Sequence, residues 1–313
     1  MDSLTRKQIR KRGRYFRHRA FSSSALKQKI ITWVIFILFL AYAISLIYPF
    51  VYLMINSFKS PNEFIGGYDP VTDTRIYPNY FWFTSNPTIQ NFIDAFNKIS
   101  VGSQETNILK MFLNSIFLSF GETVVSMAFT CMAAYVLAKY TFKGNKIIYT
   151  IVLTASFIPA VASLPATYKL MNDLSLMGTY FGMIILNASA FGGAFLYIHS
   201  YFKSIPWSFA ESAMMDGASD FRIFRQIMIP LARNGVLTFT IIRFLGFWND
   251  YWYPSLFYSN RPTIAVGIAG LGDSANAFPV ICAAMVLAVL PVLIFYAIFQ
   301  KKLMLNTIDG GLK

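Results

Sequence analysis

Long runs of apolar residues constrain this chain more than any other feature of its sequence. Five or six windows approach the roughly 20 apolar residues that a helix needs to cross a bilayer, and we count six. They lie near residues 31–55, 112–137, 147–168, 179–200, 234–258 and 279–300. Pro159 and Pro165 interrupt the third window, but prolines are tolerated in a span when neighbouring groups satisfy the freed carbonyls. The sequence therefore predicts an all-α polytopic membrane protein with six transmembrane helices.

Composition and charge agree with a membrane location. The chain is 56% hydrophobic and 13% charged, whereas a soluble domain carries about 25% charged residues. Of its 27 Lys and Arg residues, 20 fall in segments that are inside if the N-terminus is cytoplasmic. These segments are 1–29, 138–146, 201–233 and 301–313. Because Lys and Arg gather on the cytoplasmic side of membrane proteins, we expect both termini to be cytoplasmic.

The basic tail at residues 1–29 is the densest cluster of positive charge. In isolation such a tail could bind nucleic acid. We interpret it instead as a topology signal that contacts anionic lipid, since a membrane already explains the high pI. The tail and the apolar run behind it are too long for a cleavable signal peptide. Membrane lipid, and no nucleic acid, is therefore its expected partner.

The predicted spans divide the chain into segments with different expected roles. In order, these are a basic cytoplasmic tail (1–29), a first transmembrane helix (30–57), an extracytoplasmic loop (58–110), a core of five further helices (111–300) and a cytoplasmic tail (301–313). A short helix is expected at 88–98, where Thr88 can cap it. Within the core, the mildly apolar extracytoplasmic loop at 259–279 is expected to tuck into the protein.

The residues that carry enzyme chemistry are scarce. The phosphate-binding sequence GxxxxGK[ST] is absent. His18 and His199 have no partners at metal-ligand spacing, and Cys131 and Cys282 are expected to be packing residues. If the protein uses ATP, another chain must supply the nucleotide site. We therefore expect a protein that is not an enzyme and that binds no cofactor or metal of its own.

A polar insert at residues 204–230 separates two of the apolar windows. Pro206 suits a first helical turn, and Gly217 can adopt the left-handed conformation that ends a helix. Ser219 can then cap a second helix, which Pro230 ends before the next span. The pattern predicts two short helices hinged at the glycine. Such a pair either lies on the membrane surface without a partner or is held by another protein.

The insert also resembles the signature loop of the binding-protein-dependent ABC importer permeases. That family's pattern is EAA, three residues and G, with IxLP downstream, and the chain matches it at Glu211, Ala213, Gly217, Ile227 and Pro230. Ser212 replaces one alanine, and Ile229 replaces the leucine. Shorter words, such as SFK at 57–59 and WND at 248–250, resemble the carbohydrate-uptake branch that includes the maltose permeases. The resemblance spans roughly 30–313 and implies a multi-pass protein of the bacterial cytoplasmic (inner) membrane.

The resemblance implies that other chains share the work. The segment 203–232 would be a coupling loop that seats in an ATPase subunit, through Glu211, Ala213, Asp216, Gly217, Phe224 and Pro230. The tail residues Gly310, Gly311 and Lys313 resemble a tail that contacts the ATPases. The implied partners are a second homologous permease subunit, two ATPase subunits that bind ATP and Mg, and an extracellular solute-binding protein.

Five residues are candidates for the substrate pathway. Trp248, Asn249 and Asp250 begin a cluster in the fifth window, where aromatic faces can stack on sugar rings and the polar groups can bond hydroxyls. An interfacial aromatic belt or core packing is the favoured explanation for this cluster. Glu122 and Arg243 lie near the middle of their spans, where an unpaired charge is costly. We expect them to pair with each other, to line the pathway, or to pair with the second permease.

Three hypotheses of function follow. The first is a permease subunit that imports a sugar or oligosaccharide by ATP-driven alternating access, with a polyol such as glycerol-3-phosphate as the alternative substrate. An ion-coupled secondary carrier would need acids in several spans, and only Glu122 and Asp250 qualify. A membrane scaffold or receptor would leave the hinged insert and the C-terminal tail unexplained. The sequence favours the first.

Overall fold

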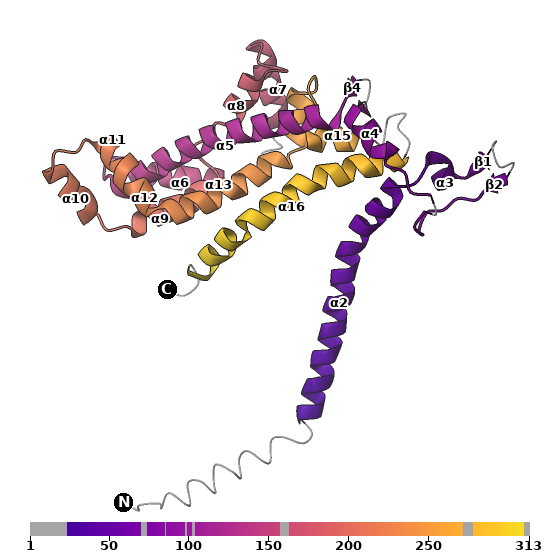
Figure 1. Cartoon of the computed structure of the whole chain (residues 1–313). Coiled ribbons are helices and arrows are strands. Elements are labelled where there is room, and N and C mark those ends of the chain that lie inside the picture. The colour runs from indigo at the N-terminus through magenta and orange to yellow at the C-terminus, as the bar shows by residue number, and fades with distance from the viewer. Residues whose placement is uncertain are drawn as a thin grey trace, which may run out of the picture.

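The computed structural model of the chain is an elongated helical bundle from which one helix diverges (Figure 1). It describes residues 24–69, 74–84, 86–97, 99–101, 104–156, 163–271 and 278–309. The longest helices are α2 (Ser24–Ser57), α5 (Ile108–Lys139), α13 (Arg233–Trp248) and α16 (Phe278–Asp309). Helices α5, α13 and α16 contact one another in the bundle. Helix α2 has buried residues only near its C-terminal end, so most of its apolar surface is uncovered.

Three described helices are long and apolar enough to cross a membrane. They are Gln28–Ser57 within α2, Ile108–Lys139, and Phe278–Ile298 within α16. A fourth span is obtained if Asp220–Leu231 and Arg233–Trp248, which meet at 82°, are counted together. The number is lower than the six predicted because two of the apolar windows do not form single helices.

Helix breaks divide the third and fourth apolar windows. The elements there are α6 (Asn145–Ala155), α7 (Leu164–Asp173), α8 (Tyr180–Asn187) and α9 (Gly193–Ser204). Pro159 lies outside the described residues, and Pro165 sits in the first turn of α7, where a missing N–H is tolerated. Gly192, between α8 and α9, has φ +148° and ψ −171°, a conformation essentially restricted to glycine. Continuous helices at 147–168 and 179–200 are therefore not observed.

Helix α5 lies at the centre of the bundle. It contacts α8, α9 and α13, and also α4, α15 and α16. Its buried face carries a row of polar side chains, namely Ser115, Ser119, Glu122, Thr123, Ser126 and Thr130. Small side chains let neighbouring helix backbones approach closely. This composition explains how one helix can pack against so many others.

Short elements gather at the N-terminal end of α5 (Figure 1). They are α3 (Pro61–Ile65), β1 (Gly67–Asp69), β2 (Thr74–Ile76), α4 (Gln90–Asn97), β3 (Ile99–Val101), β4 (Gln104–Thr106), α14 (Trp252–Phe257) and α15 (Ile264–Leu271). The strands form two antiparallel hairpins, β1 with β2 and β3 with β4. Helix α4 confirms the helix predicted at 88–98, and the Thr88 hydroxyl accepts a hydrogen bond from the Gln90 N–H at 3.1 Å.

The predicted tucking of the loop at 259–279 is also confirmed. Ile264 and Leu271 of α15 are buried in the same hydrophobic cluster as Met111 of α5. The Ile264 N–H donates to the Ser115 hydroxyl at 2.7 Å. One polar residue of α5 thereby fixes the start of the loop helix.

A comparison of two glycines in α13 tests the packing of α9 against it. An alanine Cβ at Gly235 would lie 2.6–2.7 Å from ring atoms of Tyr201 on α9, whereas one at Gly246 would meet nothing within 4 Å. We expect Gly235→Ala to lower the thermal midpoint of the purified protein, because overpacking of about 1–3 kcal/mol exceeds the helix gain of about 0.5–1 kcal/mol. Gly246→Ala is the matched control and should leave the midpoint unchanged or raise it. Equal effects of the two substitutions would contradict this packing.

Candidate functional site

The polar insert folds as a knob, residues 205–231, at the end of the bundle opposite the short strands (Figure 1). It comprises α10 (Ser208–Met215), α11 (Asp220–Ile223), a π-helical turn (Phe224–Met228) and α12 (Ile229–Leu231). Gly217 has φ +77° between α10 and α11, which confirms the predicted hinge conformation. Ser219 occupies the predicted cap position, but its side chain makes no capping hydrogen bond. Pro230 is the second residue of α12, and the helical segment Asp220–Leu231 ends one residue after it.

The inner face of the knob is buried against the bundle. Ala210, Ala213, Ile223 and Met228 belong to one hydrophobic cluster with side chains of α5 and α9. Phe224 packs its ring 5.0 Å from that of Tyr135 on α5. Of the residues predicted to act in coupling, Ala213 and Phe224 thus attach the knob to the membrane-spanning helices.

The outer face of the knob carries exposed apolar side chains among charged ones, both acidic and basic. Met215 is 89% exposed, Phe221 65% and Phe209 48%. Glu211 and Asp216 are exposed beside them. An exposed apolar patch with a polar rim marks a surface for another protein. The sequence analysis did not predict that these apolar side chains are exposed, because apolar residues at helical spacing usually indicate a buried face.

A hydrogen bond joins the knob to the C-terminal end of α5. The Tyr140 hydroxyl donates to Asp220 Oδ1 at 2.9 Å, and Lys139 Nζ donates to the carbonyl of Ile205. Burial, together with hydrogen bonds to Tyr135 and Asp220, raises the pKa of the Tyr140 phenol above its usual value. Tyr140 therefore remains a donor at neutral pH. Sequence analysis did not single out this contact, because its partners are 80 residues apart.

Inside the bundle, Glu122 is paired with a neutral side chain. It is 2% exposed, and its Oε1 accepts a hydrogen bond from Asn187 Nδ2 at 2.8 Å. Asn187 is the last residue of α8. About two helical turns further along α5, the Thr130 hydroxyl donates to the carbonyl of Ser189 at 3.4 Å. Two side chains of α5 thus hold the break between α8 and α9.

Arg243 approaches the same break from α13. A Cβ at Gly192 would lie 3.1 Å from Arg243 Nη2, and the guanidinium lies 5.9 Å from the centroid of the Phe247 ring. Within the described residues no ion pair joins Glu122 to Arg243, since the carboxylate is bonded to Asn187. The first of the three expectations for these charges is therefore not observed. A place in the pathway and a pair with a second permease stay predictions.

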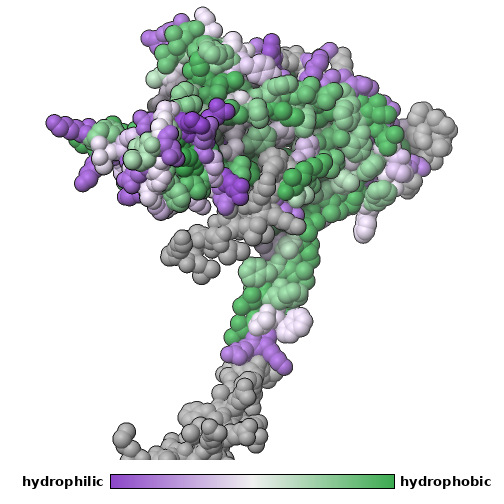
Figure 2. Space-filling model, turned by 60° about the vertical axis from the view of Figure 1, so that its left-hand side comes forward, coloured by the Kyte–Doolittle hydropathy of each residue, from purple (hydrophilic) through white to green (hydrophobic). Residues whose placement is uncertain are grey.

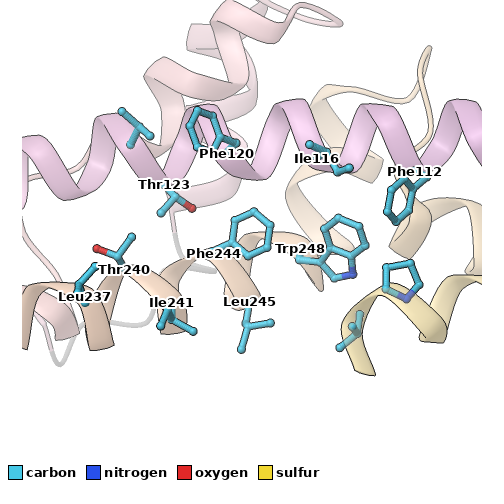
Figure 3. Close-up of a pocket in the computed structure, with 13 residues that line it drawn as sticks. Phe112, Ile116, Phe120, Thr123, Leu237, Thr240, Ile241, Phe244, Leu245 and Trp248 are labelled. Atoms are coloured by element: carbon cyan, nitrogen blue, oxygen red, sulfur yellow. The ribbon is translucent and has the colours of Figure 1, made fainter. Parts of the chain in front are cut away.

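Trp248 lies in an apolar cavity of about 520 Å³ between α5, α13 and α16 (Figure 3). Its ring packs 5.3 Å from Phe112 and 6.0 Å from Phe244. The cavity's two hydroxyls, on Thr123 and Thr240, both donate to carbonyls of their own helices. A cavity with so few free polar groups is ill suited to a hydroxyl-rich sugar. Its burial in a hydrophobic cluster favours core packing, and a place for Trp248 in the pathway stays a prediction.

The two polar neighbours of Trp248 end α13. Asn249 is exposed and donates to the carbonyl of Leu245 at 2.8 Å. Asp250 is half-buried, and its Oδ1 accepts from the Tyr253 N–H at 3.3 Å. Neither is brought to Glu122 or Arg243 by a hydrogen bond among the described residues. The tail residues Gly310, Gly311 and Lys313 lie outside the described part of the chain.

Residues 107–304 match the family described as the binding-protein-dependent transport system inner membrane component. The chain belongs to this family. The permease is 30% identical over 291 residues to the diacetylchitobiose uptake system permease protein NgcG of Streptomyces coelicolor, covering 91% of this chain and 89% of that protein. It is 26% identical over 270 residues to the melibiose/raffinose/stachyose import permease protein MelC of Bacillus subtilis, covering 85% of this chain and 91% of that one.

The fold of the permease is likewise similar to a solved structure. A chain of a bacterial ABC transporter involved in the import of the acidic polysaccharide alginate superimposes with a TM-score of 0.73 at 23% identity. The match covers 90% of this chain and 98% of that chain. The permease is a membrane transport subunit and not an enzyme, as the sequence predicted.

Substitutions at Glu122 and Asn187 test the hydrogen bond that holds the break. Glu122→Gln retains a side-chain oxygen and should keep the thermal midpoint near that of the natural protein. Glu122→Leu leaves the half-buried Asn187 amide without its acceptor, at a cost of about 1 kcal/mol, and should lower the midpoint. The double variant Glu122→Leu/Asn187→Leu should recover part of the loss, as interacting residues do. Strict additivity of the two single effects would show that the bond contributes nothing.

Proposed function

We propose that this chain is the transmembrane subunit of an ATP-driven, binding-protein-dependent importer that translocates a sugar or oligosaccharide by alternating access. The observation that carries the proposal is the knob, with a buried inner face and an exposed apolar outer face at one end of a family-typical bundle. The names of NgcG and MelC support a carbohydrate substrate. A polyol such as glycerol-3-phosphate remains an alternative substrate, and the family membership disfavours an ion-coupled carrier.

The proposed topology has six crossings with both termini in the cytoplasm. Helices α6 with α7, and α8 with α9, would each make one crossing despite their breaks. Irregular backbone at membrane depth is tolerated where protein groups satisfy it. At the second break the Thr130 hydroxyl donates to the backbone carbonyl of Ser189, and Glu122 accepts from the Asn187 side chain. The excess of Lys and Arg in the segments that include the knob supports its cytoplasmic position.

In this proposal the energy comes from other subunits. Two ATPase subunits would bind ATP and Mg, and one would receive the outer face of the knob, with Glu211 facing a basic residue. Asp216 and Gly217 would allow the bend, and the tail with Gly310, Gly311 and Lys313 would contact the ATPases. A second homologous permease would complete the pathway, to which Glu122, Arg243, Asn249 and Asp250 are assigned. An extracellular solute-binding protein would deliver the substrate.

Reversal of the charge at Glu211 tests the role of the knob. Its side chain is exposed, so Glu211→Lys should leave folding intact while opposing the basic ATPase surface. In the assembled importer in lipid, we expect substrate-stimulated ATP hydrolysis to fall to the unstimulated level. Asp173→Lys, the same charge change at an exposed position of α7, is the matched control. If Glu211→Lys hydrolysed ATP and transported like the control, the coupling role would be wrong.

Loss of the Tyr140 hydroxyl tests how the knob transmits motion to α5. Tyr140→Phe removes the bond to Asp220, which contributes about 1 kcal/mol, or roughly a five-fold change in the equilibrium that it controls. We expect less substrate transported per ATP hydrolysed, with unchanged assembly of the complex. Tyr168→Phe, at an exposed tyrosine of α7, is the control. An unaltered transport-to-hydrolysis ratio in Tyr140→Phe would exclude this route.

A further inference from the structure

Four consecutive aromatic residues form an exposed loop beside the C-terminal end of α2. We call residues 80–83 the aromatic loop. Its members are Tyr80, Phe81, Trp82 and Phe83, and their exposed fractions run from 42% to 81%, with Trp82 the highest. Large aromatic side chains that stand together outside the protein core mark a surface that something else covers. The aromatic loop has no part in the coupling or pathway assignments above.

The geometry of α2 gives the depth of this loop. The apolar stretch Gln28–Ser57 has 30 residues, and as a helix it is about 45 Å long, the thickness of a bilayer with its headgroup regions. Tyr52 precedes the helix end by about 8 Å. The ring of Phe81 lies 6.3 Å from that of Tyr52. The aromatic loop therefore lies near the boundary between lipid headgroups and hydrocarbon.

A buried polar network holds the loop at this depth. Lys59 is fully buried, and its Nζ donates to Asn56 Oδ1 at 2.8 Å and to the Asn79 carbonyl at 2.6 Å. Asn79 Nδ2 donates to Glu63 Oε1 at 3.0 Å, and Asn79 Oδ1 accepts from the Trp82 N–H at 3.1 Å. A buried ammonium is tolerated only when it is hydrogen-bonded. The same bonds fix Asn79, and with it the residues that follow.

Aromatic contacts connect the loop to two membrane helices. Phe64 packs edge-on against Tyr80 at 5.1 Å and stacks on Phe278 of α16 at 4.4 Å. The loop thus continues the apolar surface of α2, which Figure 2 shows as a mostly hydrophobic stalk below the main body. Continuity with a helix that is long and apolar enough to span the membrane favours lipid as the material that covers the loop.

We propose that the aromatic loop is an interfacial membrane anchor, which inserts its side chains among the lipid headgroups at the Ser57 end of α2. Trp and Tyr favour this zone because they combine an apolar ring with a polar group that stays in water. The anchor fixes the depth of α2 while the rest of the bundle moves. The proposal requires only that α2 spans the membrane. It can therefore be tested independently of the substrate and of coupling to ATP hydrolysis.

Spin labelling of the assembled importer in lipid nanodiscs tests the anchor. A nitroxide at Trp82→Cys is compared with one at Gln90→Cys, exposed on α4, and one at Phe39→Cys, exposed along α2. Cys131 and Cys282 are buried and are replaced in all three. We expect collisions with oxygen to dominate over collisions with a water-soluble nickel chelate at position 82, as at position 39, and the reverse at position 90. Phe83→Cys repeats the measurement if Trp82→Cys fails to assemble.

Two outcomes would overturn the proposal. In the first, the labels at positions 82 and 83 are as accessible to the nickel chelate as the label at position 90. In the second, the labels in the loop lose their accessibility to the chelate only when a solute-binding protein is added, which would make the loop a protein-docking surface. Asn79→Ala then tests the network: the label at position 82 should become more mobile and lose its preference for oxygen, while the label at position 90 stays unchanged. If the label at position 82 stayed immobile and accessible to oxygen in Asn79→Ala, the network would not be what holds the loop.

Discussion

The arrangement of this bundle depends on polar contacts between α5 and the break that separates α8 from α9. Thr130 donates there to a backbone carbonyl, that of Ser189, and Glu122 accepts from the Asn187 side chain. Away from water, each backbone group that leaves a helix must find a partner within the protein. Helices α8 and α9 are separated by a break that Gly192 makes possible, and α5 supplies polar side chains to it from Glu122 and Thr130. A purely apolar α5 would leave that break unsupported. The polar row on α5 is therefore a condition for a bundle built from broken helices.

The two ends of the bundle are held by different kinds of contact. At the knob, hydrophobic packing of Ile223 and Met228 is supplemented by a phenol–carboxylate bond between Tyr140 and Asp220. At the other end, Lys59 and Asn79 organise loops that carry little hydrophobic core of their own. In the proposed importer, the packed knob would move with an ATPase subunit, whereas the polar network would hold the other end in place.

Much of this organisation could be predicted from sequence because its signals are local. Gly217 ends a helix for a reason that lies in its own backbone, and Thr88 binds an N–H two residues away. The breaks in the third and fourth windows were missed, because hydropathy measures solubility in lipid and not helical continuity. Asn187 next to Glu122 and Tyr140 next to Asp220 are 65 and 80 residues apart, and no spacing rule connects them. Burial of Trp248 likewise depends on which helices meet there.

The 82° bend between Asp220–Leu231 and Arg233–Trp248 has a mechanical consequence. The segment Asp220–Leu231 is an arm set almost at right angles to a shaft, α13, as in a crank. A force that moves the tip of the arm sideways exerts a torque on α13 about its own axis, and little thrust along it. Arg243 and Trp248 project from that shaft in different directions, toward the broken helix and toward the apolar cavity respectively. A rotation of α13 would therefore change what both side chains face without any change in the depth of the helix.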